Sequence, residues 1–352
     1  MQPKMQFGCD RAHVEFGRNH RSRRGGDSRA RARLTRGMVE ILANSLVPVF
    51  GGLLLGYAAG LRNVVDKKDL RTLITFVMSF AAPCALFTTI VRVPHPLLGD
   101  QSKVVLVLAA VYLAIYALMY FSARRIGKLT AAESSVLSLT LAFPNAPAIG
   151  VPLIPAVYGN GSAVSVALAI AVGAATISPI TLAILESNTR DHDRPSALAR
   201  LRVSLWSAIR RPVVWAPILR VLVVAVNLVV PSYVDKSLTI FGTAIAGTAL
   251  FLTGLLVSAQ RFNLSWSVGW SVLGKTLLQP ALCLGVAHVV GLPLEQTRNV
   301  VLITAIPCGF FGVVFGKSLH ATPAVASSSL IASTVVGIFT LPGWIVLLSH
   351  LQ

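Results

Sequence analysis

Residues 141–160 read LAFPNAPAIGVPLIPAVYGN, and residues 304–323 read TAIPCGFFGVVFGKSLHATP. Each stretch lies inside a long apolar run and carries proline where a helix would otherwise continue. Because proline removes a backbone donor and clashes with the preceding turn, we expect the helices to break near Pro144 and Pro307. Irregular backbone at membrane depth persists only inside protein or beside a water-filled cavity. The two stretches therefore predict two interrupted membrane helices packed within the protein.

The two stretches are related by a shift of 163 positions along the chain. Without a gap, residues 141–179 align with 304–342 with eight of 39 positions identical, and Pro144 meets Pro307 while Pro179 meets Pro342. Composition alone explains some of this identity, but two coincident prolines at one offset favour a true repeat. The related segments are five spans apart, an odd number, so they would cross a bilayer in opposite directions. This pattern predicts an inverted repeat about an axis in the membrane plane.

The composition excludes a soluble enzyme. Hydrophobic residues make up 54% of the 352 residues and charged residues 12%, with a mean hydropathy of +0.71, whereas soluble domains are roughly 25% charged. A spanning helix takes about 20 residues. We therefore expect an all-α polytopic membrane protein with ten spans, at approximately 39–60, 70–92, 103–125, 132–157, 162–186, 212–231, 237–259, 266–289, 298–318 and 324–349.

The longest polar connection divides the spans five and five. We expect a first five-helix repeat over 38–187, a cytoplasmic connection over 188–211 and a second repeat over 212–352. Lys and Arg are unevenly shared between the two sets of connections, with 15 on one side and four on the other. The positive-inside rule then places both termini outside a cytoplasmic (inner) cell membrane.

Residues 1–37 hold ten of the 31 Lys and Arg residues, although the formal net charge of +18 belongs to the whole chain. This basic leader has no apolar core and reads as disordered. It also conflicts with an outside N-terminus, so we expect translation to start at Met38; a genuine disordered tail is the alternative. Most remaining positive charge lies in cytoplasmic connections, so it indicates topology and not a nucleic-acid partner.

Two broken helices at corresponding positions of two halves point to a transporter's binding site. Half-helix N-termini present free N–H groups and a positive dipole end, which favour a carboxylate-bearing substrate beside Pro144 and Pro307. The alternative is a pair of ordinary proline kinks.

Two polar side chains are candidates for contact with such a substrate. Asn145 lies at the first break, and its amide can donate to a carboxylate or accept from a protonated one; alternatively it satisfies carbonyls freed by the prolines. Lys275, followed by Gln279 and Pro280, can balance a substrate carboxylate or steady the broken helices, or else snorkel to the interface. Arg220 fits a site or a lipid or dimer contact equally well.

The sequence lacks the residues typical of cation exchangers, of several enzyme classes and of metal sites. All ten Asp and Glu residues beyond the leader lie in connections or at span ends, whereas a cation exchanger normally keeps buried carboxylates. The sequence contains no HExxH, GxSxG or P-loop pattern, and its four cysteines form no CxxC pair. We expect no enzyme activity, no cofactor and no metal site.

The motifs resemble those of the auxin efflux carrier family. They are LVPVFGGLLLGYAAG in the first span, FVMSFAAPCALF in the second, FPNAPAIGVPL, GTALFLTGLLV, GKTLLQPALC, AIPCGFFGVVFGKSL and a final TLPGW, together covering about 39–352. The short central connection is similar to that of bacterial members described as malonate or malate permeases.

The resemblance implies a fold like that of bile-acid/sodium symporters and an elevator mechanism. Spans three to five and eight to ten would form a transport domain, and the other four a scaffold that can dimerise. The breaks would cross, with Pro144 and Asn145 facing Pro307 and Cys308 at the substrate carboxylate. Plant carriers have asparagine where this chain has Cys308, and a thiol is a weak donor. Phe143, Gly150, Gly309 and Lys275 complete the residues expected at the substrate.

We therefore expect a secondary active transporter of small organic anions such as malonate or malate, working in a lipid bilayer with a proton or sodium as coupling ion. The alternatives are a sodium- or proton-coupled transporter of another solute on the same fold, or a membrane receptor that does not transport. The connections are too short for a signalling module, which disfavours the receptor.

Overall fold

The computed structural model describes residues 40, 43–65, 70–91, 101–189, nine positions between 212 and 230, and residues 231–260, 262–318 and 321–351. The basic leader, most of the 188–211 connection and Arg220 lie outside the described residues, so the predictions made for them stay predictions. Residues 45–352 form one unit of packed helices, which is described below.

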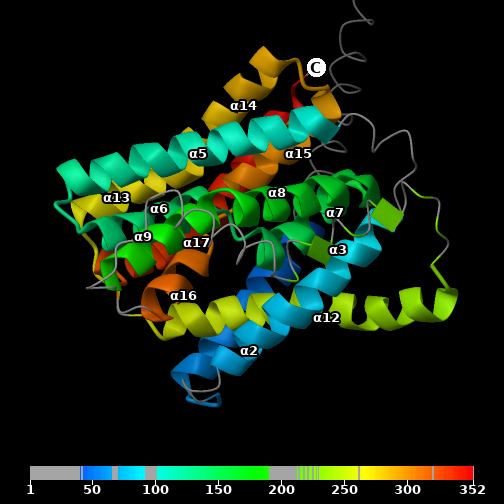
Figure 1. The fold of residues 1–352 in the computed structure, drawn as a ribbon, viewed down its shortest axis with the longest axis horizontal. Coiled ribbons are helices and arrows are strands. Elements are labelled where there is room, and N and C mark those ends of the chain that lie inside the picture. Colours follow the sequence, from blue (N-terminus) through cyan, green and yellow to red (C-terminus); the bar gives the residue numbers. More distant parts are fainter. Residues whose placement is uncertain are drawn as a thin grey trace, which may run out of the picture. The chain divides into compact units, whose positions relative to one another are not determined.

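The described residues are helical, with one isolated β-bridge (Figure 1). The first half contains α2 (Leu70–Phe76), η1 (Val77–Ala81), α3 (Ala82–Val91), α5 (Gln101–Arg125), α6 (Ala131–Ala142), η2 (Ala146–Gly150), α7 (Val151–Tyr158), η3 (Asn160–Ser162), α8 (Ala163–Ala175) and α9 (Ile177–Thr189). The second half contains α12 (Ser232–Ser258), α13 (Trp266–Leu273), η4 (Gly274–Leu278), α14 (Gln279–Val290), α15 (Leu294–Ala305), α16 (Phe311–Ser318) and α17 (Ala324–Ser349).

Six helical segments are long and apolar enough to cross a membrane: Ala43–Leu61, Gln101–Arg125, Asn160–Leu185, Ser232–Ser258, Trp266–Val290 and Ala324–Ser349. They coincide with the predicted spans one, three, five, seven, eight and ten. The predicted spans four and nine are each formed by two shorter helices, α6 with α7 and α15 with α16. The chain is thus a multi-pass helical membrane protein, while the count of ten spans stays a prediction.

Local sequence signals fix the start of α6 and the end of α14. Thr130 and Glu133 form a capping box at the start of α6, in which the Thr130 side chain accepts from the Glu133 N–H and the Glu133 carboxylate accepts from the Thr130 N–H. Gly291 ends α14 in the left-handed conformation (φ 66°), which glycine adopts without a Cβ penalty.

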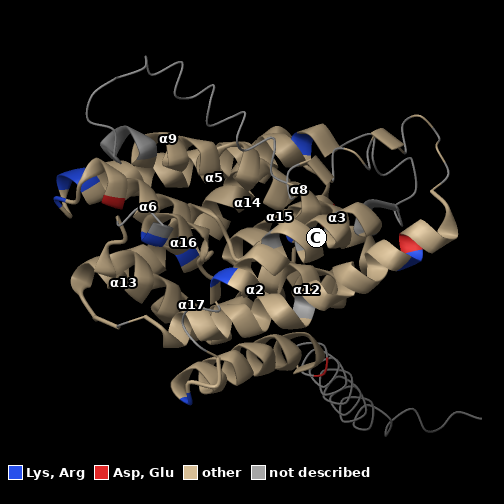
Figure 2. Cartoon of the chain, turned by 60° about the horizontal axis from the view of Figure 1, so that its bottom comes forward, with Lys and Arg blue, Asp and Glu red and all other residues tan. Residues whose placement is uncertain are grey.

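The helices pack so that the broken pair lies in the interior. α5 packs along α6 and α8, and α12 packs against α3 and η2; Figure 1 shows α5 running along α6 and α8, with α12 crossing α3. Charged residues gather at helix ends and in connections, whereas the helix bodies carry few of them (Figure 2). This distribution fits helices whose bodies lie in hydrocarbon.

Candidate functional site

The two proline breaks meet each other. Pro144 and Cys308 form the isolated antiparallel bridge. The bridge is flanked by two backbone hydrogen bonds, from the Asn145 N–H to the Pro307 carbonyl (3.0 Å) and from the Gly309 N–H to the Phe143 carbonyl (2.8 Å). The segments are 163 positions apart in sequence but adjacent in space. We call this arrangement, Phe143–Ala146 against Ile306–Gly309, the crossing.

Glycine at 309 makes the crossing geometrically possible. A Cβ placed there would overlap the Phe143 carbonyl oxygen, which is a backbone atom that cannot rotate away. On the other side, a Cβ on Gly337 of α17 would lie 2.6 Å from the Pro307 ring. The backbone at both positions packs so closely against its neighbours that only glycine fits without a shift.

A buried lysine and glutamine satisfy carbonyls that the breaks set free. Gln279 donates through Nε2 to the Ala142 carbonyl at the end of α6 (2.8 Å). Lys275 donates through Nζ to the Thr304 carbonyl near the end of α15 (3.2 Å) and to Gln279 Oε1 (2.7 Å). Because the last carbonyls of a helix have no partner within it, this pair caps both broken helices from the η4–α14 segment. The steadying role expected for Lys275 is therefore present in the structure.

Lys275 is also the one charged side chain that is fully buried among the described residues, with an exposed fraction of 0%. The described Asp and Glu side chains are all at least partly exposed. Its ammonium group donates to two neutral oxygens, Gln279 Oε1 and the Thr304 carbonyl. A buried ammonium group thus sits beside the crossing without a buried carboxylate in the described part of the chain.

The orientation of the Asn145 amide follows from its hydrogen bonds. Asn145 Nδ2 lies 3.2 Å from Thr253 Oγ1 of α12. Thr253 gives its single hydroxyl hydrogen to the Ala249 carbonyl (2.7 Å), so it can only accept from the amide, and the nitrogen must face it. The Asn145 Oδ1 is then left as a buried acceptor without a partner in the structure. This atom can receive a donated hydrogen.

At the second break the residue after proline has a different environment. Cys308 is fully buried, and its N–H donates to Ser333 Oγ of α17 (3.1 Å). The Asn145 and Gly309 N–H groups are likewise taken by carbonyls. The expectation that the N–H groups beside the prolines are free for a carboxylate is therefore wrong for this structure, because each lies within reach of a protein acceptor.

Phe143 and Gly150 take packing roles at the crossing. The Phe143 ring stacks on Phe311 at 4.9 Å between centroids, and a Cβ on Gly173 would lie 2.6 Å from it. A Cβ on Gly150 would lie 3.2 Å from Ile306 at the second break. The structure thus brings all eight predicted residues to the crossing or its direct supports, but it does not test their contact with substrate.

Three residues of this region were missed or undervalued from sequence. Thr253 and Ser333 stand 108 and 25 positions from the groups that they bind, and nothing in their local sequence marks them. Gln279 had a signal, because it follows Lys275 by four residues and so lies on the same helix face.

Comparison with known proteins identifies the family to which the chain belongs. A family model described as "Membrane transport protein" matches residues 41–345. The chain is 28% identical over 312 residues to "Uncharacterized transporter YfdV" of Escherichia coli (strain K12), which covers 88% of this chain and 98% of that protein. It is 23% identical over 325 residues to an "Uncharacterized transporter" of Methanothermobacter thermautotrophicus, covering 89% of this chain and 99% of that protein.

Proposed function

Because the chain belongs to the family of membrane transport proteins that includes the auxin efflux carriers, we propose that it is a secondary active transporter of small organic anions that binds carboxylate at the crossing. The observation that carries this proposal is that the crossing has two buried polar groups, an amide oxygen on Asn145 without a partner and the ammonium group of Lys275 that caps α15. The two groups favour different chemical groups on a substrate.

Lys275 favours an anion. A buried charge is costly unless it is paired and hydrogen-bonded, and the oxygens of Gln279 and Thr304 solvate the ammonium without neutralising it. A carboxylate arriving at the crossing offsets this cost. A cationic or neutral substrate does not, which disfavours the alternative of a transporter for another kind of solute.

Asn145 favours a hydrogen donor. With its nitrogen turned to Thr253, the amide presents Oδ1, which repels a carboxylate oxygen and accepts from a carboxyl O–H. A short dicarboxylic acid in its singly ionised form has one group of each kind, a carboxyl for Asn145 and a carboxylate for Lys275. Malonate-like and malate-like acids fit this description, and the proton that couples transport would travel on the substrate itself.

The bond between Asn145 and Thr253 also bears on the transport cycle. In the proposed elevator arrangement η2 belongs to the moving transport domain and α12 to the scaffold. The Nδ2–Oγ1 hydrogen bond (3.2 Å) joins the two, so it must break whenever the transport domain moves. We propose that this architecture has ten spans as two inverted five-helix repeats, 38–187 and 212–352, in a homodimer in the cytoplasmic membrane with both termini outside.

The proposal is tested with purified protein in liposomes that contain a pH-sensitive dye. Addition of external malonate or malate should produce uptake and acidify the interior, with choline in place of sodium. Asn145→Ala should lower uptake about 10- to 100-fold, since a hydrogen bond to a charged or strongly polar partner contributes about 1.5–3 kcal/mol and each 1.4 kcal/mol is tenfold.

Asn299→Ala is the matched control, because Asn299 of α15 also holds a buried, unpartnered amide oxygen but is outside the crossing. Full uptake by the Asn145→Ala variant would refute the site. Strict dependence on sodium without acidification would replace the proton with sodium as the coupling ion.

A further inference from the structure

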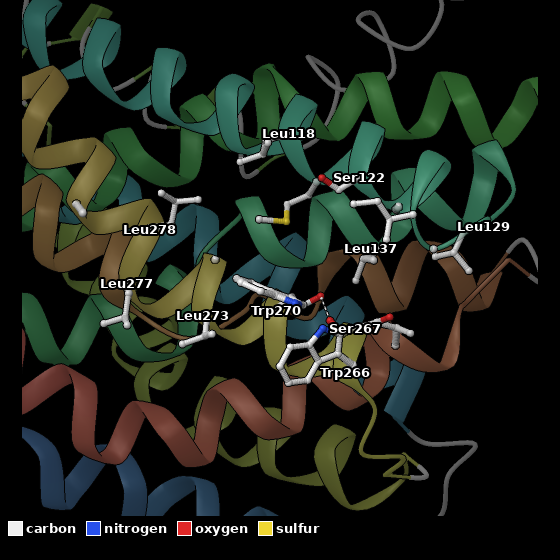
Figure 3. Close-up of a pocket in the computed structure, with 18 residues that line it drawn as sticks. Leu118, Ser122, Leu129, Leu137, Trp266, Ser267, Trp270, Leu273, Leu277 and Leu278 are labelled. Atoms are coloured by element: carbon white, nitrogen blue, oxygen red, sulfur yellow. Dashed lines mark hydrogen bonds between the residues drawn. The ribbon is translucent and has the colours of Figure 1, made fainter.

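A pocket lies away from the crossing. It is open, mostly apolar and has a volume of about 730 Å³. Its walls include residues of α5, the α5–α6 connection, α6 and the α13–η4–α14 segment. Figure 3 shows Leu118 and Ser122 of α5 opposite Trp266 and Trp270 of α13, with Leu137 of α6 toward one end. None of the crossing residues lines it, so the pocket is separate from the proposed substrate site.

The pocket opens sideways, toward the surface that lipid would cover. Trp266 is 81% exposed and Ile126 82% exposed, although both line the pocket. The rings of Trp266 and Trp270 meet edge to face at 5.9 Å between centroids. Tryptophan is enriched where a membrane protein meets the lipid headgroups. The walls of the pocket therefore suit an acyl chain, and its tryptophan pair marks the headgroup level.

Cations stand at the rim of the pocket. Arg124, Arg125 and Lys128 are exposed and alternate along the chain with residues that line it. Arg124 donates to the Leu129 carbonyl (2.7 Å), which holds the rim in shape. The lining residues, all of them described, include no acid, and the carboxylate of Glu133 is committed to capping α6. The rim thus carries net positive charge above an apolar space.

We propose that this pocket binds an anionic phospholipid, with an acyl chain between α5 and α13 and its phosphate against Arg125 and Lys128. Basic pockets between membrane helices on the cytoplasmic side favour anionic headgroups over zwitterionic ones. The positive-inside rule places this rim on that side. The ligand belongs to the inner leaflet and enters from it laterally.

Tryptophan quenching by brominated lipids tests the proposal. The full-length protein is placed in phosphatidylcholine nanodiscs with increasing fractions of brominated phosphatidylglycerol or brominated phosphatidylcholine. The difference between the unchanged protein and the Trp266→Phe/Trp270→Phe variant isolates the emission of the pocket. Half-maximal quenching should need an about 30-fold lower fraction of the anionic lipid, the ratio expected for two cations that each contribute about 1 kcal/mol.

Two variants sharpen the result. Arg125→Gln/Lys128→Gln should remove the preference for the anionic lipid, whereas Arg62→Gln/Arg71→Gln, two exposed cations elsewhere, should keep it. Ala281→Phe should fill the pocket and reduce quenching, whereas Val289→Phe, on an exposed part of α14 outside the pocket, should not. Equal quenching by both headgroups would overturn the proposal, as would release of the brominated lipid by malonate. Neither result would touch the proposed transport function.

Discussion

The two broken helices share a backbone arrangement and differ in chemistry. At the first break the residue after proline is Asn145, whose amide oxygen lacks a partner. At the second it is Cys308, whose N–H is anchored by Ser333. The supports differ as well, because a neutral amide caps α6 and an ammonium group caps α15. The crossing therefore presents a hydrogen-bond acceptor on one side and a positive charge on the other. Under the proposed function, this difference would let the site distinguish the two ends of a substrate.

The largest effect should come from disrupting the backbone contact between the two broken helices. In Gly309→Ala the new methyl group overlaps the Phe143 carbonyl oxygen, so the crossing must separate. We expect a loss of about 3 kcal/mol in stability, the upper part of the range for overpacking, seen as a lower melting temperature in detergent. Gly343→Ala, where no atom lies within 4 Å of the added Cβ, should melt like the unchanged protein.

The next effect should distinguish the charge of Lys275 from its role in capping α15. Lys275→Met and Gln279→Leu each leave a helix-end carbonyl unpaired, so both should lower stability by about 1–3 kcal/mol. Lys275→Met alone should also lower uptake of dicarboxylates by at least about tenfold, since it removes a charge-assisted contact. Equal uptake by the two variants, at equal amounts of folded protein, would mean that Lys275 only caps α15.

A smaller effect should appear at the anchor of the second break. Ser333→Ala leaves the buried Cys308 N–H without its acceptor, which costs about 1 kcal/mol or somewhat more. The melting temperature should fall and the KM for substrate should stay unchanged. Ser349→Ala, at an exposed hydroxyl bonded within its own helix, is the control. A change in KM without a change in melting temperature would place Ser333 at the substrate instead.

The smallest effect is expected at the thiol itself. Cys308→Ala keeps the backbone bridge and removes a weak donor. Uptake should therefore stay within about twofold of the unchanged protein, well below the tenfold change that corresponds to about 1.4 kcal/mol. The measurement is initial uptake rate in the same liposomes. A loss as large as that expected for Asn145→Ala would make the two breaks chemically equivalent after all.

Much of this arrangement was accessible from sequence because its causes are local. Proline at 144 and 307 removes a backbone donor and clashes with the preceding turn, and α6 and α15 indeed end at Ala142 and Ala305. The offset of 163 positions singled out two segments that the structure places in contact. By contrast, free N–H groups at the breaks were a wrong expectation, because their acceptors come from segments that local sequence cannot place.

The sequence by itself determined a helical membrane protein with two interrupted helices and a polar residue at the first break, since hydropathy and proline act through neighbouring residues. Tertiary structure decided what those polar groups do. Only the packing of α12 against η2 turns the Asn145 nitrogen to Thr253 and leaves its oxygen unpaired. Only the placement of η4 beside both breaks makes Lys275 and Gln279 their caps. Hydrogen-bond partners distant in sequence depend on how helices pack, and the same side chain is a donor, an acceptor or a support according to what lies within hydrogen-bond distance of it.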